Sequence, residues 1–325
     1  MSTVLGRGHC GGHITLLFTI DDSSEDPVNQ GSRGVGICIK DGVEAIAKGE
    51  EGSGELSVRF QEIEYDSSMY EDVLSELVTN IPEIGGFDWE LNIKMALPAS
   101  QGFGMSASGA VASAMSIQRA IGIPHEECVR RSFLVAHIVE RKRSSGLGDT
   151  TALSSGGVER RIASGSPFSG TLLDNGPGFS EGWSIKIPLL LAWKEKTGMH
   201  TSSYIDSEEW GRKICQAGEN GMERIGSGDW NEDRWSQIIE EALIFSSESG
   251  LESDASRLEI IDLTNKAIAD SGYSDSVSVM LCMLGESVVI VPKDPFFVDK
   301  WIDKISEALE NSGLASFSSV VGELM

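Results

Sequence analysis

Residues 97–114 read LPASQGFGMSASGAVASA and join a predicted strand to a predicted helix. The strand is expected over Trp89–Met95, WELNIKM, because its residues alternate between apolar and polar as in a half-buried strand. The small residues after the glycines predict a thin, closely packed helix that runs toward Ile121. The local order is therefore strand, glycine loop and helix N-terminus.

The glycine loop is a candidate site for an anion, most often a phosphate. The first turn of a helix presents unpaired backbone N–H groups and partial positive charge. Gly102 and Gly104 lack a Cβ atom, so a phosphate can approach the main chain closely. Ser106 and Ser108 add hydroxyls on the first turn, where one of them could contact a phosphate or a metal ion.

The loop is also compatible with two other structures. A tight turn with a serine N-cap has the same composition, and this alternative stays open. Gly102, Gly104 and Ala107 also fit the dinucleotide pattern G-x-G-x-x-A, but that site needs an acid at the end of a second strand about 20 residues on. Glu126 and Glu127 instead follow a proline and open a helix, which argues against it. The sequence holds no G-x-x-x-x-G-K-[ST], which excludes a P-loop.

Composition limits the classes of function. The chain has 325 residues, enough for two domains, and its 26 basic and 50 acidic residues give a formal charge of −24. Such a protein repels nucleic acid and anionic lipid at long range, so we expect no partner of either kind. We expect a cytoplasmic protein, because it has neither a convincing signal peptide nor an apolar run long enough to span a membrane.

The five cysteines are an odd number, widely spaced, and form no C-x-x-C pair. A disulfide framework or a zinc site is therefore not expected, and a reducing compartment fits. Cys10 and His13 lie close in sequence, but two possible ligands are a weak metal signal.

Two acids follow the glycine loop. A helix is expected over His125–Lys142, and it places His137 and Glu140 on the same side. A second glycine turn, SSGLG, then leads to Asp149. Two carboxylates beside a phosphate loop suit phosphoryl transfer, with one holding a metal ion and the other taking the proton of the attacking hydroxyl. The alternatives are a solvated Glu140 paired with a neighbouring arginine, and Asp149 as a helix N-cap.

Other residues are candidates for gripping a substrate. Ser32 and Arg33 lie between glycines and could hold a carboxylate or phosphate, or simply enter a hairpin. Arg160 and Arg161 follow a Gly-Gly pair and point to opposite sides of a strand, so at most one reaches the site easily. An arginine fork matches a carboxylate. His137 could donate to a substrate hydroxyl or carboxylate, or be a core histidine.

The remaining pattern predicts an α+β protein of two domains without internal repeats. A breaker-rich boundary falls at residues 164–170. The expected strands are 12–20, 37–39, 56–63, 171–173, 183–193, 277–284, 287–291 and 316–321, with a turn at Asp41–Gly42; the expected helical segments are 70–80, 201–254 and 295–311.

These motifs resemble those of the GHMP small-molecule kinases. Pro98…Gly102-Phe103-Gly104-Met105-Ser106-Ala107 is similar to the family's phosphate loop, P-x-x-x-G-[LF]-G-x-S-[AG]. Glu140 and Gly146-Leu147-Gly148-Asp149 resemble its magnesium ligand and catalytic aspartate. Within the family, the archaeal pantoate kinases are the most similar group, through residues 13–15, 31–34, 136–140, 156–161 and 280–288. Met105 and the single Gly285 depart from the general family pattern but match this group.

The resemblance implies a fold and an activity. The fold is a ribosomal-protein-like α+β domain over residues 1–168 and a ferredoxin-like α+β domain over residues 169–325. The activity is transfer of the ATP γ-phosphate to pantoate, which yields 4-phosphopantoate on the way to coenzyme A. Ser106 and Glu140 would hold Mg²⁺, Pro98 and residues 102–107 would bind ATP, and Asp149 with His137 would act in catalysis. Ser32, Arg33, His137 and Arg161 would bind pantoate.

Competing hypotheses remain at this point. Another GHMP kinase would act on mevalonate, homoserine or a sugar, and a non-catalytic relative would bind nucleotide without turnover. An RNA-binding module of similar architecture is disfavoured by the charge of −24. The family also implies a homodimer.

Overall fold

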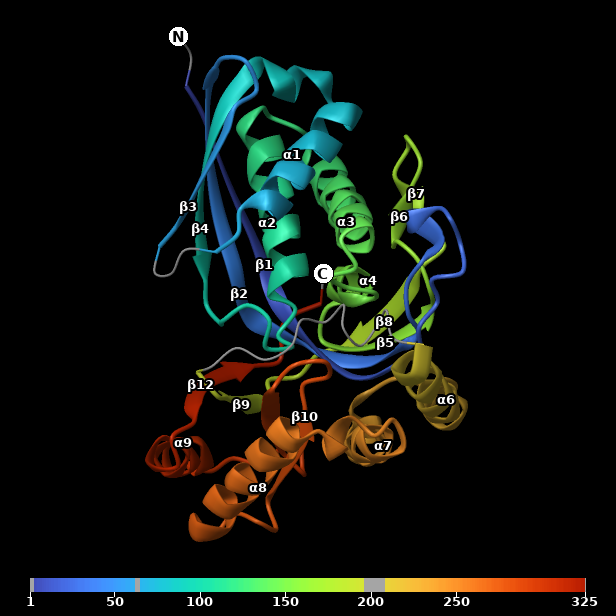
Figure 1. Cartoon of the computed structure of the whole chain (residues 1–325), viewed down its shortest axis with the longest axis vertical. Helices are drawn as coiled ribbons and strands as arrows, with labels where there is room; N and C mark the ends of the chain where they lie inside the picture. The colour runs from blue at the N-terminus through green and yellow to red at the C-terminus, as the bar shows by residue number, and fades with distance from the viewer. Residues whose placement is uncertain (1–2, 62–64, 196–207, 325) are drawn as a thin grey trace.

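Two sheets, each covered by helices, organise this computed structural model, which describes residues 3–61, 65–195 and 208–324 (Figure 1). The first sheet has the strand order β3-β4-β2-β5-β8, with β1 paired to the other side of β2. Its strands are β1 (Val4–Phe18), β2 (Gly34–Glu51), β3 (Leu56–Phe60), β4 (Phe87–Met95), β5 (Val158–Ala163) and β8 (Phe179–Trp183). β3 and β4 are parallel, and the other pairs are antiparallel.

The long strand β2 replaces an expected turn. The prediction of a turn at Asp41–Gly42 is wrong, because β2 continues through both residues. Gly42 instead lies opposite a bulge at Gly11/Gly12 of β1, where a Cβ on Gly42 would lie 2.1 Å from the Cys10 carbonyl oxygen. The glycine is therefore required by the close approach of two strands rather than by a reversal of the chain.

Four helices belong to the same half of the chain: α1 (Ser68–Asn80), α2 (Met105–Ala120), α3 (His125–Lys142) and α4 (Asp149–Ser155). α2 is almost entirely buried against β1. A Cβ on Gly6 or Gly8 of β1 would lie about 2 Å from a carbonyl oxygen of α2. The small residues of α2 meet glycines of β1, which lets the helix lie close to the sheet.

The second sheet has the order β10-β11-β9-β12, with all its pairs antiparallel. Its strands are β9 (Pro188–Trp193), β10 (Val277–Leu281), β11 (Ser287–Pro292) and β12 (Ala315–Val320). The helices of this half are α6 (Glu208–Ile225), α7 (Trp235–Glu248), α8 (Ala255–Asp270) and α9 (Trp301–Asn311). The expected hairpin around Gly285 is confirmed, and β12 agrees with the expected last strand.

Several expected elements differ from the structure. Thr171–Leu173 is a turn, because it connects the two-residue strands β6 (Phe168–Ser169) and β7 (Asp174–Asn175), which pair with each other. Thr171 and Leu172 are exposed, whereas Leu173 is buried and has φ +53°. The run 183–193 is divided between β8 and β9, which belong to different sheets. The helix expected from Pro295 begins only at Trp301. Residues 62–64 and 201–207 of the expected elements lie outside the described residues.

The two sheets are joined near the end of the chain. The Val321 N–H donates to the Ile187 carbonyl at 3.0 Å, and the Gly322 N–H donates to the Cys38 carbonyl at 2.8 Å. Leu324 forms an isolated bridge with Gly156. The domain limits 1–168 and 169–325 stay a prediction. Because β8 pairs with β5 in the first sheet, the pairing favours a limit after Trp183.

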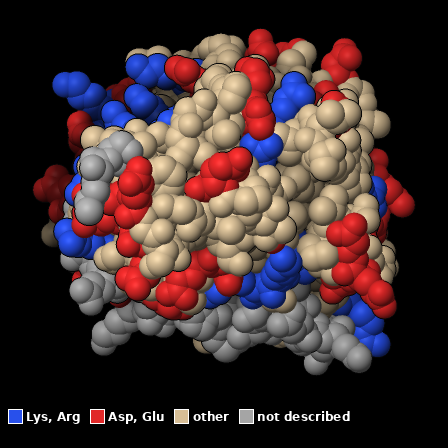
Figure 2. Space-filling model, turned by 90° about the horizontal axis from the view of Figure 1, so that it is seen from above, with Lys and Arg blue, Asp and Glu red and all other residues tan. Residues whose placement is uncertain are grey.

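The surface reflects the acidic composition. Acidic side chains are scattered over the face shown in Figure 2, and Lys and Arg lie among them. None of the helices in the described part of the chain is long and apolar enough to cross a membrane.

Candidate active site

A cavity of about 520 Å³ lies where the glycine loop, the start of α4 and the β10–β11 turn meet. Loop residues 102–106 form one wall, residues 143–149 form the opposite wall, and Met283 and Leu284 reach in from the second sheet. Its apolar part is lined by Phe60, Tyr65, Met69, Tyr70 and Met95. A cavity of this size, with apolar walls and a few converging polar groups, has the usual properties of a small-molecule site.

The glycine loop is held tightly from two sides. Gly102 has φ +78°, and a Cβ there would lie 2.9 Å from the Cys282 carbonyl oxygen. Gly104 has φ +67°, and a Cβ there would lie 2.9 Å from the His13 nitrogen. Both glycines are therefore required for conformation and for space. Gly104 is also the N-cap of α2 and has no side chain to satisfy the first N–H groups of the helix.

Ser106 and Ser108, both in the first turn of α2, have different roles. Ser106 is the second residue of α2, so the alternative of a serine N-cap is wrong. Its Oγ donates to Glu140 Oε1 at 2.6 Å. Ser108 is buried, donates to the Cys10 carbonyl at 2.7 Å and accepts from the Val43 N–H at 3.0 Å. Ser106 therefore lines the cavity, while Ser108 ties the helix to the sheet.

Glu140 is buried on α3, where it contacts the cavity-lining residues Ser106 and Ser145. Its Oε1 also accepts from Ser145 Oγ at 2.8 Å. Burial, followed by the nearby negative charge of Asp149, raises the pKa of the Glu140 carboxyl to about 7. The alternative of a solvated acid paired with an arginine is wrong, because Glu140 is only 3% exposed.

Asp149 is the first residue of α4, and Gly148 is the N-cap, so the alternative of Asp149 as N-cap is wrong. Its Oδ1 lies 2.7 Å from His13 Nδ1. Burial acts to raise the pKa of Asp149, but the hydrogen bond and charge of His13 and the charge of Arg161 outweigh it and lower that pKa. A Cβ on Gly146 would lie 1.9 Å from Glu140 Oε2 and 3.0 Å from Asp149 Oδ2. The glycine therefore lets both carboxylates approach one point.

Ser32 and Arg161 meet beside Asp149. A Cβ on Gly148 would lie 2.2 Å from Ser32 Oγ and 2.7 Å from Arg161 Nε. Arg161 donates through Nη1 to Glu159 Oε1 at 2.5 Å. Its Nε and Nη2 are buried and have no hydrogen-bond partner among the described residues. Arg160 points the other way, bonds to the Ile225 carbonyl and stacks on Trp230.

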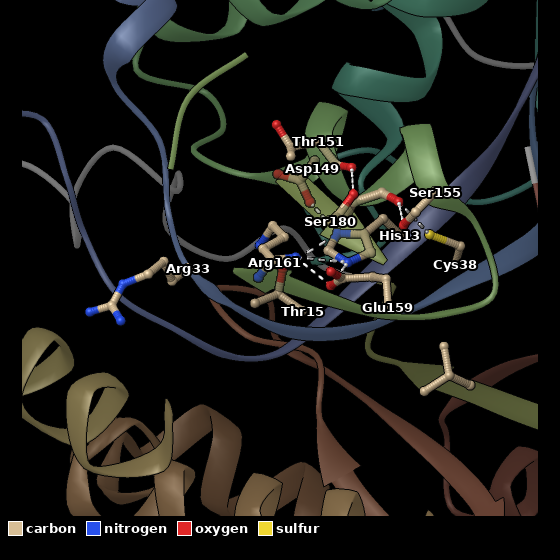
Figure 3. Close-up of polar contacts among 12 residues, drawn as sticks. His13, Thr15, Arg33, Cys38, Asp149, Thr151, Ser155, Glu159, Arg161 and Ser180 are labelled. Atoms are coloured by element: carbon tan, nitrogen blue, oxygen red, sulfur yellow. Dashed lines mark hydrogen bonds and ion pairs between the residues drawn. The ribbon is translucent and has the colours of Figure 1, made fainter. Parts of the chain in front are cut away.

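Several predicted site residues do not line the cavity: Arg33, Pro98, Ala107, His137, Glu140 and Arg161. Arg33 and His137 make their contacts elsewhere. The Arg33 guanidinium points away from the cluster in Figure 3 and pairs with Glu219 of α6. His137 lies within 3.0 Å of both Thr150 Oγ1 and the Pro27 carbonyl oxygen, so both ring nitrogens are occupied. Burial lowers the pKa of His137 to about 4, which keeps the ring neutral. His137 thus holds the start of α4 in place from behind.

Of the other predicted loop residues, some line the cavity and some do not. Phe103 and Met105 line the cavity although both are nearly fully buried, and the Phe103 ring packs edge-on against Trp193 of β9. Pro98 leads from β4 into the loop, and Ala107 is buried in α2. Neither of them is a cavity-lining residue.

Sequence interpretation missed His13 and Glu159 as members of the site. His13 lies on β1 between Asp149 and Glu159, as Figure 3 shows. A signal was present, because Glu159 and Arg161 stand two apart on one strand and therefore share a face. The strand pairing that brings His13 to that face is not visible in the sequence.

Comparisons with known proteins agree with this geometry. Residues 68–157 match the family described as GHMP kinases N terminal domain. A pantoate kinase from Thermococcus kodakarensis is 29% identical over 172 residues, which cover 51% of this chain and 55% of that protein. The match therefore spans about half the length of this curated relative.

Two solved structures are similar over nearly the whole chain. One is described as a phosphotransferase related to the CoA biosynthesis pathway, with TM-score 0.75, 22% identity and coverage of 98% of this chain and 96% of that one. The other is described as MDDEF in complex with MVAPP, AMPPCP and magnesium, with TM-score 0.64, 13% identity and coverage of 100% and 99%. At these identities the likeness shows the fold, and it confirms the expected α+β class.

Proposed function

We propose that this chain, a member of the GHMP kinases through residues 68–157, transfers the γ-phosphate of ATP to a hydroxyl of pantoate. The products are ADP and 4-phosphopantoate. One observation carries the proposal: Asp149 and the open N-terminus of α2 line one cavity, and the Glu140 carboxylate accepts hydrogen bonds from Ser106 and Ser145 in its wall. The similarity to a pantoate kinase supports the choice of substrate.

The nucleotide phosphates would lie against the glycine loop. The first N–H groups of α2 point out of the helix there, and Gly102 and Gly104 leave the main chain uncovered. Backbone donors and the helix dipole bind phosphate without basic side chains. This suits a chain whose net charge of −24 would otherwise repel a nucleotide.

Ser106 and Glu140 would hold Mg²⁺. A hydroxyl and a carboxylate that lie 2.6 Å apart beside a phosphate site form the oxygen donor set that Mg²⁺ takes in kinases, with further ligands from phosphate and water. The buried Glu140 carboxylate, beside the like charge of Asp149, would gain a counter-charge from the ion. The ion would neutralise negative charge on the transferred phosphoryl group.

Asp149 would orient the attacking hydroxyl and accept its proton. The lowered pKa keeps this carboxylate ionised at neutral pH, so its free oxygen can accept a hydrogen bond from the substrate. Phosphoryl transfer depends mostly on positioning and charge. A weakly basic carboxylate is therefore an adequate acceptor for the proton of the substrate hydroxyl.

Ser32 and Arg161 would bind the acid end of pantoate. A buried guanidinium with two unpartnered N–H groups leaves an unmet hydrogen-bonding demand, which a carboxylate satisfies in two-pronged geometry. Arg161 lies beside Asp149, so this contact would place the far end of a short hydroxy acid at the reacting group.

A coupled assay of ADP release tests the proposal. We expect ADP to form with ATP, Mg²⁺ and pantoate, and only slowly without pantoate. Asp149→Asn should lower kcat by roughly a hundredfold or more, while the affinity for nucleotide is kept. Faster turnover of mevalonate, homoserine or a sugar would replace pantoate as substrate, and full function of Asp149→Asn would refute the enzymatic role.

A further inference from the structure

Four charged side chains form a continuous chain that ends in the cavity (Figure 3). His13 Nδ1 lies 2.7 Å from Asp149 Oδ1, and His13 Nε2 lies 3.0 Å from Glu159 Oε1. Arg161 Nη1 lies 2.5 Å from the same Glu159 oxygen. The Asp149 side chain is open to the cavity and 21% exposed, whereas the side chains of His13 and Glu159 are 0% exposed.

The sheet leaves room for these side chains. Glu159 and Arg161 of β5 lie opposite Gly36 and Gly34 of β2. A Cβ on Gly36 would lie 2.3 Å from His13 Nε2 and 2.7 Å from Glu159 Oε1, and one on Gly34 would lie 2.5 Å from Arg161 Nη2. The absence of a side chain at Gly34 and Gly36 therefore leaves the space that His13, Glu159 and Arg161 occupy.

With Asp149 and Glu159 ionised, one set of proton positions accounts for both contacts of His13 with the carboxylates. A carboxylate that is ionised only accepts hydrogen bonds, so both ring nitrogens of His13 must donate to make these two contacts. His13 is then an imidazolium, and two positive groups balance the negative charges of Asp149 and Glu159. In the competing arrangement Nε2 is unprotonated and accepts from Arg161 Nη1, which lies 3.3 Å away.

The surroundings favour the imidazolium. Burial acts to lower the pKa of His13, but the hydrogen bonds to Asp149 and Glu159 and the charges of both acids outweigh it and raise that pKa. Besides the four charged side chains themselves, the titratable groups around them are the Cys38 thiol of β2 and Glu140 of α3. Removing one carboxylate would leave a buried, half-compensated cation.

We propose that Glu159 and His13 act as positioning residues, with Glu159 holding His13 as an imidazolium that fixes the Asp149 carboxylate in its reactive orientation. This rests on the proposed role of Asp149 as proton acceptor. Because both nitrogens of His13 already carry protons, the ring cannot take a further proton from Asp149. The chain is therefore a clamp rather than a proton relay, and the substrate proton leaves Asp149 through the cavity.

Nitrogen NMR of the purified wild-type protein, with ¹⁵N-labelled histidine, tests the charge state directly. We expect His13 to show two protonated ring nitrogens at pH 7, and the buried His137 to show the one-proton pattern of a neutral ring. A neutral His13 would overturn the proposal. This measurement uses no variant and no substrate, so it stands even if pantoate proves to be the wrong acceptor.

Glu159→Gln tests the effect on Asp149. The amide can still accept from Arg161, but it no longer supplies the charge that holds the imidazolium. We expect kcat to fall by about tenfold or more, because the variant loses part of the rate enhancement that a positioned base provides. The KM values for ATP and pantoate should stay within about threefold of the wild-type values. The His13 spectrum should change in the same variant.

Glu181→Gln is the matched control. Glu181 lies on β8 in the same sheet and pairs with Arg160, on the side of the sheet away from the cavity. We expect its kcat to equal that of the wild type. If Glu159→Gln behaved like this control, Glu159 would have no positioning role; if the wild type did not turn over pantoate, the proposed function would fail while the spectrum still decided the state of His13.

Discussion

Arg33 and Arg161 are both candidates for an anionic substrate by sequence, and the fold separates them. Arg161 is buried, with its unpartnered N–H groups beside Ser32. Arg33 is on the surface and paired with Glu219. A buried fork with unmet hydrogen bonds is a strong ligand for a carboxylate, whereas an exposed ion pair contributes little.

Arg161→Lys should raise KM for pantoate. The lysine keeps a positive charge but loses the planar fork, and a hydrogen bond to a charged group contributes about 1.5–3 kcal/mol, so we expect a rise of roughly tenfold or more. Arg33→Ala should leave KM within about twofold, since its pair is exposed. Steady-state kinetics with varied pantoate measures both values. Equal effects of the two substitutions would contradict the assignment of Arg161 to the substrate.

His137 shows how a single buried ring affects stability. It lies behind α4 and contacts Thr150 and the Pro27 carbonyl rather than the cavity. Its pKa of about 4 in the folded protein is below the ordinary value of 6.5 that applies in the unfolded chain. Between these values the unfolded chain binds a proton that the folded chain does not, so stability rises with pH across this window.

The free energy of unfolding should therefore fall as the pH drops below about 6.5, and this loss should be missing in His137→Gln. The interval from 6.5 to about 4 corresponds to roughly 3 kcal/mol for the one ring. Urea denaturation at several pH values, compared between the wild type and the variant, measures the difference. A difference that does not depend on pH would show that His137 is not buried as a neutral ring.

At the scale of elements, the glycine loop depends on backbone conformation and on close packing together. Gly104 and Gly122 both have positive φ, +67° and +82°. A Cβ on Gly104 would lie within 3.0 Å of the main chain of His13, whereas a Cβ on Gly122 would have no heavy atom within 4 Å. This pair of glycines separates the two requirements.

Gly104→Ala should therefore cost more than Gly122→Ala. Both substitutions place an alanine at positive φ, which costs on the order of 1 kcal/mol. Gly104→Ala must also displace the start of α2 or β1, so we expect weaker binding of an ATP analogue by tenfold or more. Chemical denaturation and titration calorimetry measure the two effects. Equal nucleotide affinity in both variants would mean that the loop does not hold the phosphates.

The elements also show how far sequence interpretation reaches. The alternation of residues 89–95 predicted β4, and the small residues after the glycine loop predicted α2, which is buried almost all round. The local pattern failed at Asp41–Gly42, where β2 continues because it pairs with β1, and at Thr171–Leu173, where the chain reverses between β6 and β7. Both outcomes depend on which strands pair, and strand pairing is a tertiary property that a local pattern does not contain.

The candidate site was predictable in the same uneven way. The glycine loop, Glu140 and Asp149 follow one another along the chain, so their spacing indicates a shared place. His13 and Glu159 come from strands far apart in sequence, and only the register of β1, β2 and β5 brings them together. The error over Arg33 has a similar cause, because the neighbouring Ser32 faces the cavity and Arg33 faces α6.

At the scale of the whole molecule, residues from both sheets and their connections line one cavity. The first sheet and its helices supply the acids, and the second sheet presses the β10–β11 turn against the loop. The Met283 N–H donates to the Thr15 carbonyl at 3.1 Å, and Ser287 Oγ donates to the Gln101 carbonyl. The shape of the cavity therefore depends on how the two sheets are joined.

The acidic surface in Figure 2 has a consequence for how ligands arrive. ATP and pantoate are both anions, so the negative electrostatic potential around the protein repels them until they come close enough for the helix dipole to attract them. Dissolved ions shorten the reach of that field to roughly 8 Å at physiological ionic strength. Encounter with both anions should therefore become faster as salt is added, the opposite of what salt does to a protein that steers its ligand by attraction.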